Sequence, residues 1–154
     1  MDLSTGTNKQ VTHQFHDDSI YGFELVQPVP ELDQWDSEII LDIDHILEWR
    51  KTDDQFKFLI SKAELRFIDV SDLQVSFGFP NSTITTLPID RIDRENEPNL
   101  EREPNDVQYR WKIRLHDRNN GFFSFLSTGY QLNLIGDPVL CDDQFIPAEI
   151  RTNL

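Results

Sequence analysis

The chain has 154 residues, with 38% hydrophobic and 11% aromatic side chains, which is the composition of a soluble globular protein with one domain. Its 28 acidic and 14 basic side chains give a formal net charge of −14, and this charge disfavours nucleic acid and anionic membranes as partners. Residues 1–60 hold 13 acidic and 4 basic side chains, so we expect a cationic partner to dock on the N-terminal part. The composition leaves the oligomeric state open.

Cysteine usage and targeting signals indicate a cytoplasmic protein. Met1–Val11 is polar and lacks the apolar segment of a signal peptide, and no run is long enough to span a membrane. The single cysteine, Cys141, excludes an internal disulfide, and the neighbouring Asp142 and Asp143 disfavour its thiolate. The sequence has no glycine-rich phosphate loop, Cys-x-x-Cys pair or nucleophile elbow, so we expect no cofactor and no catalytic residue.

The first residues, 1–14, have almost no apolar content and are predicted to form a flexible tail ahead of a single domain over residues 15–154. His16, Asp17 and Asp18 follow directly. They could ligate a metal, but aspartates also form turns by hydrogen bonding to their own backbone. We favour a turn that leads into a strand.

A first strand is predicted over Ile20–Val26. It precedes a loop, Gln27–Ser37, whose two prolines cannot donate to a strand ladder. We expect Trp35 to pack back onto the edge of the sheet.

Residues Ile39–Trp49 alternate apolar and polar side chains, which predicts a long, half-buried strand. His45 faces inward by parity, and we expect it to be a hydrogen-bonded core residue. Asp42 and Asp44 share the outer face two positions apart, where they could bind a divalent cation or contact solvent; we favour solvent. The predicted inward residues are Ile39, Leu41, Ile43, His45, Leu47 and Trp49.

The next segment predicts a hairpin with a loop over residues 50–55. Pairing Trp49 with Phe56 would place Glu48 opposite Lys57, and this pair of opposite charges supports the register.

The inward positions of the returning strand change from even to odd numbers near Ser61, which predicts a β-bulge there. Ser61 and Glu64 also have the spacing of a helix capping box, but we favour the strand. Two further strands are predicted over Val70–Phe79 and Ile84–Ile92. The second carries Pro88 and is therefore expected at an edge.

Val107–His116 is the most regular alternating strand. Asn120-Gly121 predicts a tight hairpin turn after it, and pairing outward from that turn sets Trp111 opposite Tyr130. The outer face of the strand is basic, a pattern that can bind single-stranded nucleic acid. The net charge instead favours an internal pairing with the acidic face of residues 38–49. Residues 136–154 are expected to be a tail with one short covering strand.

Three segments carry a resemblance. The motif F-H-D-D-x-I at 15–20, the acidic strand ending in E-W and the motif L-R-F-I-D-V at 65–70 resemble small acidic bacterial proteins of unassigned function. Some of those proteins are similar to all-β immunity proteins of polymorphic toxin systems. The resemblance implies an interaction protein that blocks a toxin and has no active site.

These patterns predict an all-β domain, a mostly antiparallel sandwich or strongly curled sheet of about seven to nine strands. The leading hypothesis is a non-catalytic, acidic protein-binding domain, in its narrower form an immunity-type protein that neutralises a basic partner. The expected partner-binding residues are Asp42, Asp44, Glu48, Asp53 and Asp54. The alternative is a metal-binding domain or metal-dependent hydrolase with the ligands His16, Asp17, Asp18, Asp42 and Asp44.

Overall fold

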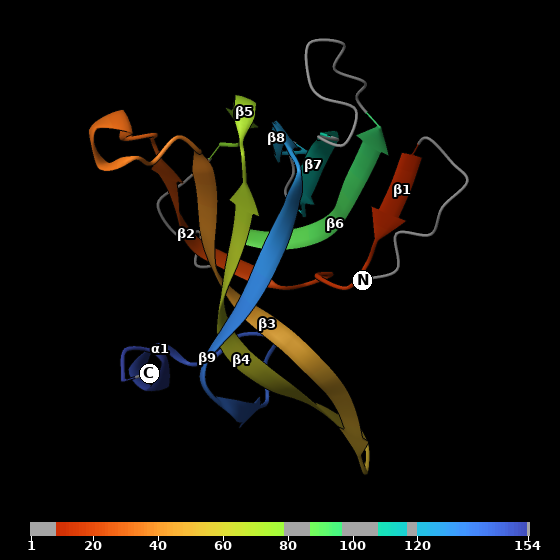
Figure 1. The fold of residues 1–154 in the computed structure, drawn as a ribbon. Helices are drawn as coiled ribbons and strands as arrows, with labels where there is room; N and C mark the ends of the chain where they lie inside the picture. Colours follow the sequence, from red (N-terminus) through yellow and green to blue (C-terminus); the bar gives the residue numbers. More distant parts are fainter. Residues whose placement is uncertain (1–8, 79–86, 97–107, 117–119, 154) are drawn as a thin grey trace.

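A computed structural model describes residues 9–78, 87–96, 108–116 and 120–153 of the chain. Within these residues the fold is almost entirely β, as predicted (Figure 1). The strands are β1 (Lys9–Thr12), β2 (Ser19–Val26), β3 (Glu38–Thr52), β4 (Gln55–Ile68), β5 (Ser71–Ser76), β6 (Leu87–Asn96), β7 (Tyr109–Leu115), β8 (Phe122–Ser127) and β9 (Gly129–Cys141). One turn of 3-10 helix, η1 (Pro30–Leu32), and one short helix, α1 (Ala148–Arg151), complete the described elements.

The strands form one antiparallel sheet in the order β5-β8-β7-β6-β2-β3-β4-β9, and β1 pairs with β6 beside this path. Figure 1 shows β3, β4 and β9 running side by side in front of the half that holds β6, β7 and β8. The sheet thus curls so that its two halves face each other across one core, which is the predicted architecture.

Aromatic side chains from both halves meet at the centre of this core. Phe67 of β4 lies 5.2 Å from Trp111 of β7 and 4.7 Å from Phe125 of β8, measured between ring centroids. Tyr130 of β9 lies 5.9 Å from Trp111. The indole N–H of Trp111 donates to the carbonyl oxygen of Ser127 at 3.0 Å, so its one polar atom is satisfied.

The ladder between β3 and β4 is the longest in the sheet and ends in a two-residue turn at Asp53 and Asp54. Asp53 has a φ of 53°, a left-handed conformation that tight hairpin turns require. The predicted loop over residues 50–55 is therefore wrong. Trp49 lies opposite Phe58 rather than Phe56 because the turn is centred on Asp53 and Asp54, one residue later than in the predicted hairpin.

Two irregularities change which side chains of this hairpin face inward. The pairing of β3 with β4 shifts around Leu47, so Ile46 is buried whereas Leu47 and Trp49 are 40% and 50% exposed. The predicted inward series is thus right up to His45 and wrong beyond it. The pairing of β4 with β9 shifts around Ser61, where the bulge was predicted.

Beyond these shifts the sheet carries a second, smaller core. Its buried residues are Ile46, Phe58, Ile60, Cys141 and Ile146. Burial, together with the nearby carboxylates of Asp44, Asp142 and Asp143, raises the pKa of the Cys141 thiol. The thiolate is therefore disfavoured, as the sequence predicted.

The predicted register of the last hairpin is wrong. Trp111 lies opposite Phe125, and Tyr130 belongs to β9, which pairs with β4 at the other end of the sheet. The chain changes partner at Ser127, whose hydroxyl donates to the carbonyl oxygen of Ile68 at 2.5 Å. The sequence from β8 to β9 has no break in its strand-forming residues, but it forms two strands because the chain turns a corner after Ser127.

The structure differs from the sequence prediction at both chain ends and at β6. β1 lies inside the predicted tail of residues 1–14, so paired structure begins at Lys9; residues 1–8 lie outside the described residues. β6 is an inner strand that pairs with β1, β2 and β7, so the predicted edge position is wrong. Near the C-terminus, Val139 and Leu140 are part of β9, whereas Phe145 and Ile146 are in no strand.

Replacement of Phe67 by alanine is expected to lower the free energy of unfolding by about 3–5 kcal/mol, because it leaves a cavity between the two halves of the sheet. Chemical denaturation checks this value. Phe56→Ala is the matched control, since Phe56 is 53% exposed and its loss should cost less than about 1 kcal/mol. Equal losses in the two variants would contradict the assignment of the core.

Candidate functional site

Asp42 and Asp44 of β3 are engaged by one residue of the C-terminal helix. The guanidinium of Arg151 donates to Asp44 at 3.0 Å and to Asp42 at 2.6 Å. Asp44 is fully buried and also accepts the backbone N–H of Ile146 at 2.8 Å and the hydroxyl of Tyr21 at 2.9 Å. The prediction of Asp44 as a partner-binding surface residue is therefore wrong, and an arginine occupies the place of the predicted cation.

Asp18 and His45 form a buried pair. The Nδ1 atom of His45 lies 2.6 Å from one carboxylate oxygen of Asp18, and the other oxygen accepts the backbone N–H of Ile46 at 2.9 Å. Burial raises the pKa of the Asp18 carboxyl to about 6, and the His45 imidazole opposes this rise. Both side chains are closed off from solvent, so the pair holds the start of β2 to β3, and His45 is the hydrogen-bonded core residue that the sequence predicted.

His16 and Asp17 face a different part of the molecule. His16 lies against Asp90 of β6 and His116, which follows β7, while Asp17 accepts a hydrogen bond from Gln144 at 3.0 Å. The five predicted metal ligands are thus divided among three separate sets of contacts. The metal set of His16, Asp17, Asp18, Asp42 and Asp44 does not assemble, because His45 and Arg151 engage its buried members.

The remaining predicted docking residues lie at the end of the β3–β4 hairpin among cations. Glu48 contacts Arg50 at 3.1 Å instead of the predicted Lys57, and Lys57 contacts Asp142 at 2.6 Å. Asp53 and Asp54 are exposed in the turn. Because Arg50, Lys51 and Lys57 share this hairpin end with the three acids, it does not form the acidic surface that was expected.

The basic stripe of β7 is also neutralised from within the fold. Arg110 contacts Asp72 of β5 at 2.7 Å, and Arg114 contacts Asp93 of β6 at 2.5 Å. The stripe is paired inside the fold, but the predicted pairing with the acidic face of residues 38–49 is wrong, because the acids come from β5 and β6. A stripe of basic residues in the sequence indicates that acidic partners are needed, but it does not indicate which strand supplies those acids.

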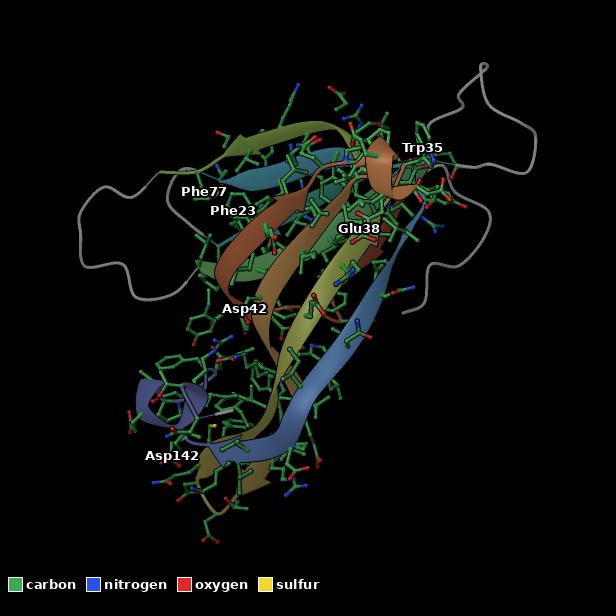
Figure 2. The ribbon with its side chains drawn as sticks, turned by 60° about the vertical axis from the view of Figure 1, so that its left-hand side comes forward. Phe23, Trp35, Glu38, Asp42, Phe77 and Asp142 are labelled. Atoms are coloured by element: carbon green, nitrogen blue, oxygen red, sulfur yellow. The ribbon has the colours of Figure 1, made fainter. Side chains whose placement is uncertain are left out.

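The sequence did not predict a role for the loop between β2 and β3, which carries the two most exposed large hydrophobic side chains of the described residues. We call residues 27–37 the Trp35 loop. Its Leu32 and Trp35 are 68% and 67% exposed, so the prediction that Trp35 packs on the sheet edge is wrong. Figure 2 shows Trp35 at the same end of the sheet as Glu38 and at the opposite end from Asp142.

The Trp35 loop has a defined conformation. The backbone N–H of Val29 and the carbonyl oxygen of Gln34 are 2.8 Å apart, which closes the loop at its base. The η1 turn lies inside this closure and ends at Leu32; the next residue, Asp33, has a φ of 58°. The indole N–H of Trp35 donates to the Asp33 carboxylate at 2.8 Å, which orients the exposed ring.

The Trp35 loop lies in a stretch of sequence that carries acidic residues but no lysine or arginine. Residues 10–49 contain ten acidic side chains and no lysine or arginine. In the loop, Glu31, Asp33 and Asp36 are all exposed, and no lysine or arginine of the described residues forms an ion pair with them. The absence of basic residues over residues 10–49 is a signal in the sequence from which this surface could have been predicted.

Comparisons of the chain with protein-family models, curated proteins and solved structures gave no match. The described residues contain no helix of the length and apolar character needed to cross a membrane.

Arg151→Met is expected to lower the free energy of unfolding by about 3–5 kcal/mol, because it leaves the buried carboxylate of Asp44 without its cation. Thermal or chemical denaturation at neutral pH measures the loss. Arg50→Met is the matched control, because Arg50 forms a solvent-exposed pair with Glu48 worth about 0–1 kcal/mol. A loss for Arg151→Met no larger than for Arg50→Met would show that the C-terminal helix does not depend on this contact.

Proposed function

We propose that the protein is a non-catalytic binding domain that captures a basic protein partner through the Trp35 loop. The observation that supports this most directly is an ordered loop with an exposed tryptophan among acids that have no cationic partner within the described residues. An immunity-type role, in which the partner is a basic toxin met in the cytoplasm, is the narrower form of this proposal.

The apolar part of the loop would supply affinity. Fully burying a side chain of the size of leucine or tryptophan is worth about 1.5–3 kcal/mol, and this gain is unrealised while Leu32 and Trp35 remain exposed. Tryptophan is among the residues that most often dominate binding energy at the centre of an interface. Because the base of the loop and the Trp35 indole are already fixed by hydrogen bonds, binding would cost little ordering entropy.

The acidic part of the loop would supply speed and selectivity. Carboxylates around an aromatic ring attract a lysine- or arginine-rich surface and repel an acidic one. An arginine of the partner could stack on the face of Trp35 while it pairs with Asp33 or Asp36, a cation–π contact worth about 0.5–2 kcal/mol. The excess of acids over residues 10–49 would raise the association rate at low salt.

The test compares two exposed tryptophans. Trp35→Ala should weaken partner binding by at least about 2 kcal/mol, roughly thirtyfold in Kd, whereas Trp49→Ala should leave it nearly unchanged. Trp49 is a matched control because it is 50% exposed and lies near the far end of β3, about 35 Å along the strand from Glu38, where the Trp35 loop joins β3. The partner is first isolated by photo-crosslinking from position 32 in a cell extract, and Kd is then measured with the purified partner.

The charge of the partner provides an independent readout. The crosslinked protein should have a basic surface, and Glu31→Gln with Asp36→Asn should slow its association and weaken the salt dependence of the rate. A crosslinked partner that is acidic, or one that binds Trp35→Ala as tightly as wild type, would rule the proposal out.

A further inference from the structure

We propose that His16, Asp90 and His116 form a binding site for a divalent transition-metal ion, with zinc as the ion that best suits two imidazole nitrogens and one carboxylate. This site does not involve the Trp35 loop. Of its three ligands only His16 belongs to the metal set expected from the sequence.

The three side chains converge from distant parts of the chain. One ligand atom of each residue lies within 4.8 Å of one ligand atom of the other two, and they form the one such group among the described histidine, cysteine, aspartate and glutamate residues. The rings of His16 and His116 lie 5.4 Å apart between centroids, and Nε2 of His116 is 3.2 Å from Oδ1 of Asp90. A small movement of these side chains would bring them to metal–ligand distances of about 2 Å.

Backbone hydrogen bonds hold the three segments together, so the group is built on a fixed framework. The N–H of Asp17 donates to the carbonyl oxygen of Ile89 at 2.8 Å, and the N–H of Ile89 donates to the carbonyl oxygen of Asp18 at 2.8 Å. The N–H of His116 donates to the carbonyl oxygen of Pro88 at 2.8 Å. The turn before β2 and the end of β7 are thereby both joined to the start of β6, which carries Asp90.

The outer contacts of two ligands leave their binding atoms available. The Nδ1 atom of His16 lies 2.8 Å from the backbone carbonyl oxygen of Asp90. A carbonyl can only accept, so in the neutral ring Nδ1 carries the proton and Nε2 holds the lone pair that a metal ion would bind. Arg91 contacts Oδ2 of Asp90 at 3.2 Å and leaves Oδ1 facing His116. Contacts of this kind orient metal ligands in proteins, where a histidine ligand commonly donates its second ring N–H to a carbonyl.

The site also has room for further ligands. Asp17 lies 3.4 Å from Nε2 of His16, so its carboxylate could complete the coordination sphere. Asp17 and His116 both line an adjacent pocket of about 510 Å³, whose wall also includes Asp142 and Asp143. Water or another small oxygen ligand in this pocket would reach the remaining position, which is the arrangement of an open rather than a closed zinc site.

The experiment is titration of the purified full-length protein, stripped with EDTA, with zinc by calorimetry and with cobalt by visible absorption. Wild type should bind one ion per chain, show a cobalt spectrum that reports nitrogen ligands, and melt at a higher temperature with zinc than with EDTA. His16→Gln, Asp90→Asn and His116→Gln should each weaken binding by at least about tenfold and remove the melting shift. Their melting temperatures in EDTA should match wild type, because all three side chains are at least partly exposed.

Two controls separate this site from unspecific chelation. His13→Gln removes an exposed histidine whose ring lies 6.5 Å from that of His16 but which is outside the ligand group, and it should retain zinc binding. Magnesium should bind far more weakly than zinc, because imidazole is a poor ligand for it. The proposal is overturned if wild type binds no zinc, if the three ligand variants bind as wild type does, or if His13→Gln loses as much affinity as His16→Gln.

Discussion

The change of inward face along β3 and β4 is the constraint on which the rest of the fold depends. Side chains of a strand alternate strictly between two faces, so one long hairpin can serve two cores only where an extra residue interrupts the alternation. The irregularities around Leu47 and Ser61 provide this interruption. On one side of them the hairpin packs against the curled half of the sheet around Phe67. On the other side it carries the small core of Phe58 and Ile146, to which the C-terminal segment is attached.

The two cores place carboxylates where solvent cannot reach them, and this determines how the excess negative charge is distributed. Buried Asp18 is satisfied by His45, and buried Asp44 by Arg151. Each of these contacts also joins distant segments, so the internal acids contribute to the fold and are not available to a partner. The acids of the Trp35 loop are exposed and form no ion pair with a lysine or arginine of the described residues, so they remain available to an external cation.

β2 connects the two surfaces that we propose to be functional, the metal site at His16 and the Trp35 loop. The turn with His16 precedes this strand and the Trp35 loop follows it, so about 26 Å of extended chain separates them. One surface combines an exposed aromatic ring with carboxylates, which suits a basic protein. The other combines imidazoles with a carboxylate, which suits a metal ion. The chemistry of the two surfaces differs enough that one can be disabled by mutation without affecting the other.

The sequence by itself determined the features that depend on neighbouring residues. These are the all-β class, the strand over residues 39–49, the inward position of His45, the bulge near Ser61 and a turn before β2. That turn is held by backbone hydrogen bonds, whereas the Asp17 and Asp18 side chains bind distant residues instead of their own backbone. Tertiary structure alone decided which strands pair and which charges meet. The hairpin registers depended on turn geometry and on the corner after Ser127, where an unbroken apolar pattern changes partner. Arg151 lies 107 residues from Asp44, and Asp90 lies 74 residues from His16. Alternation reports which face a residue occupies, but contacts between such distant residues depend on how the whole sheet curls, and no local pattern encodes that.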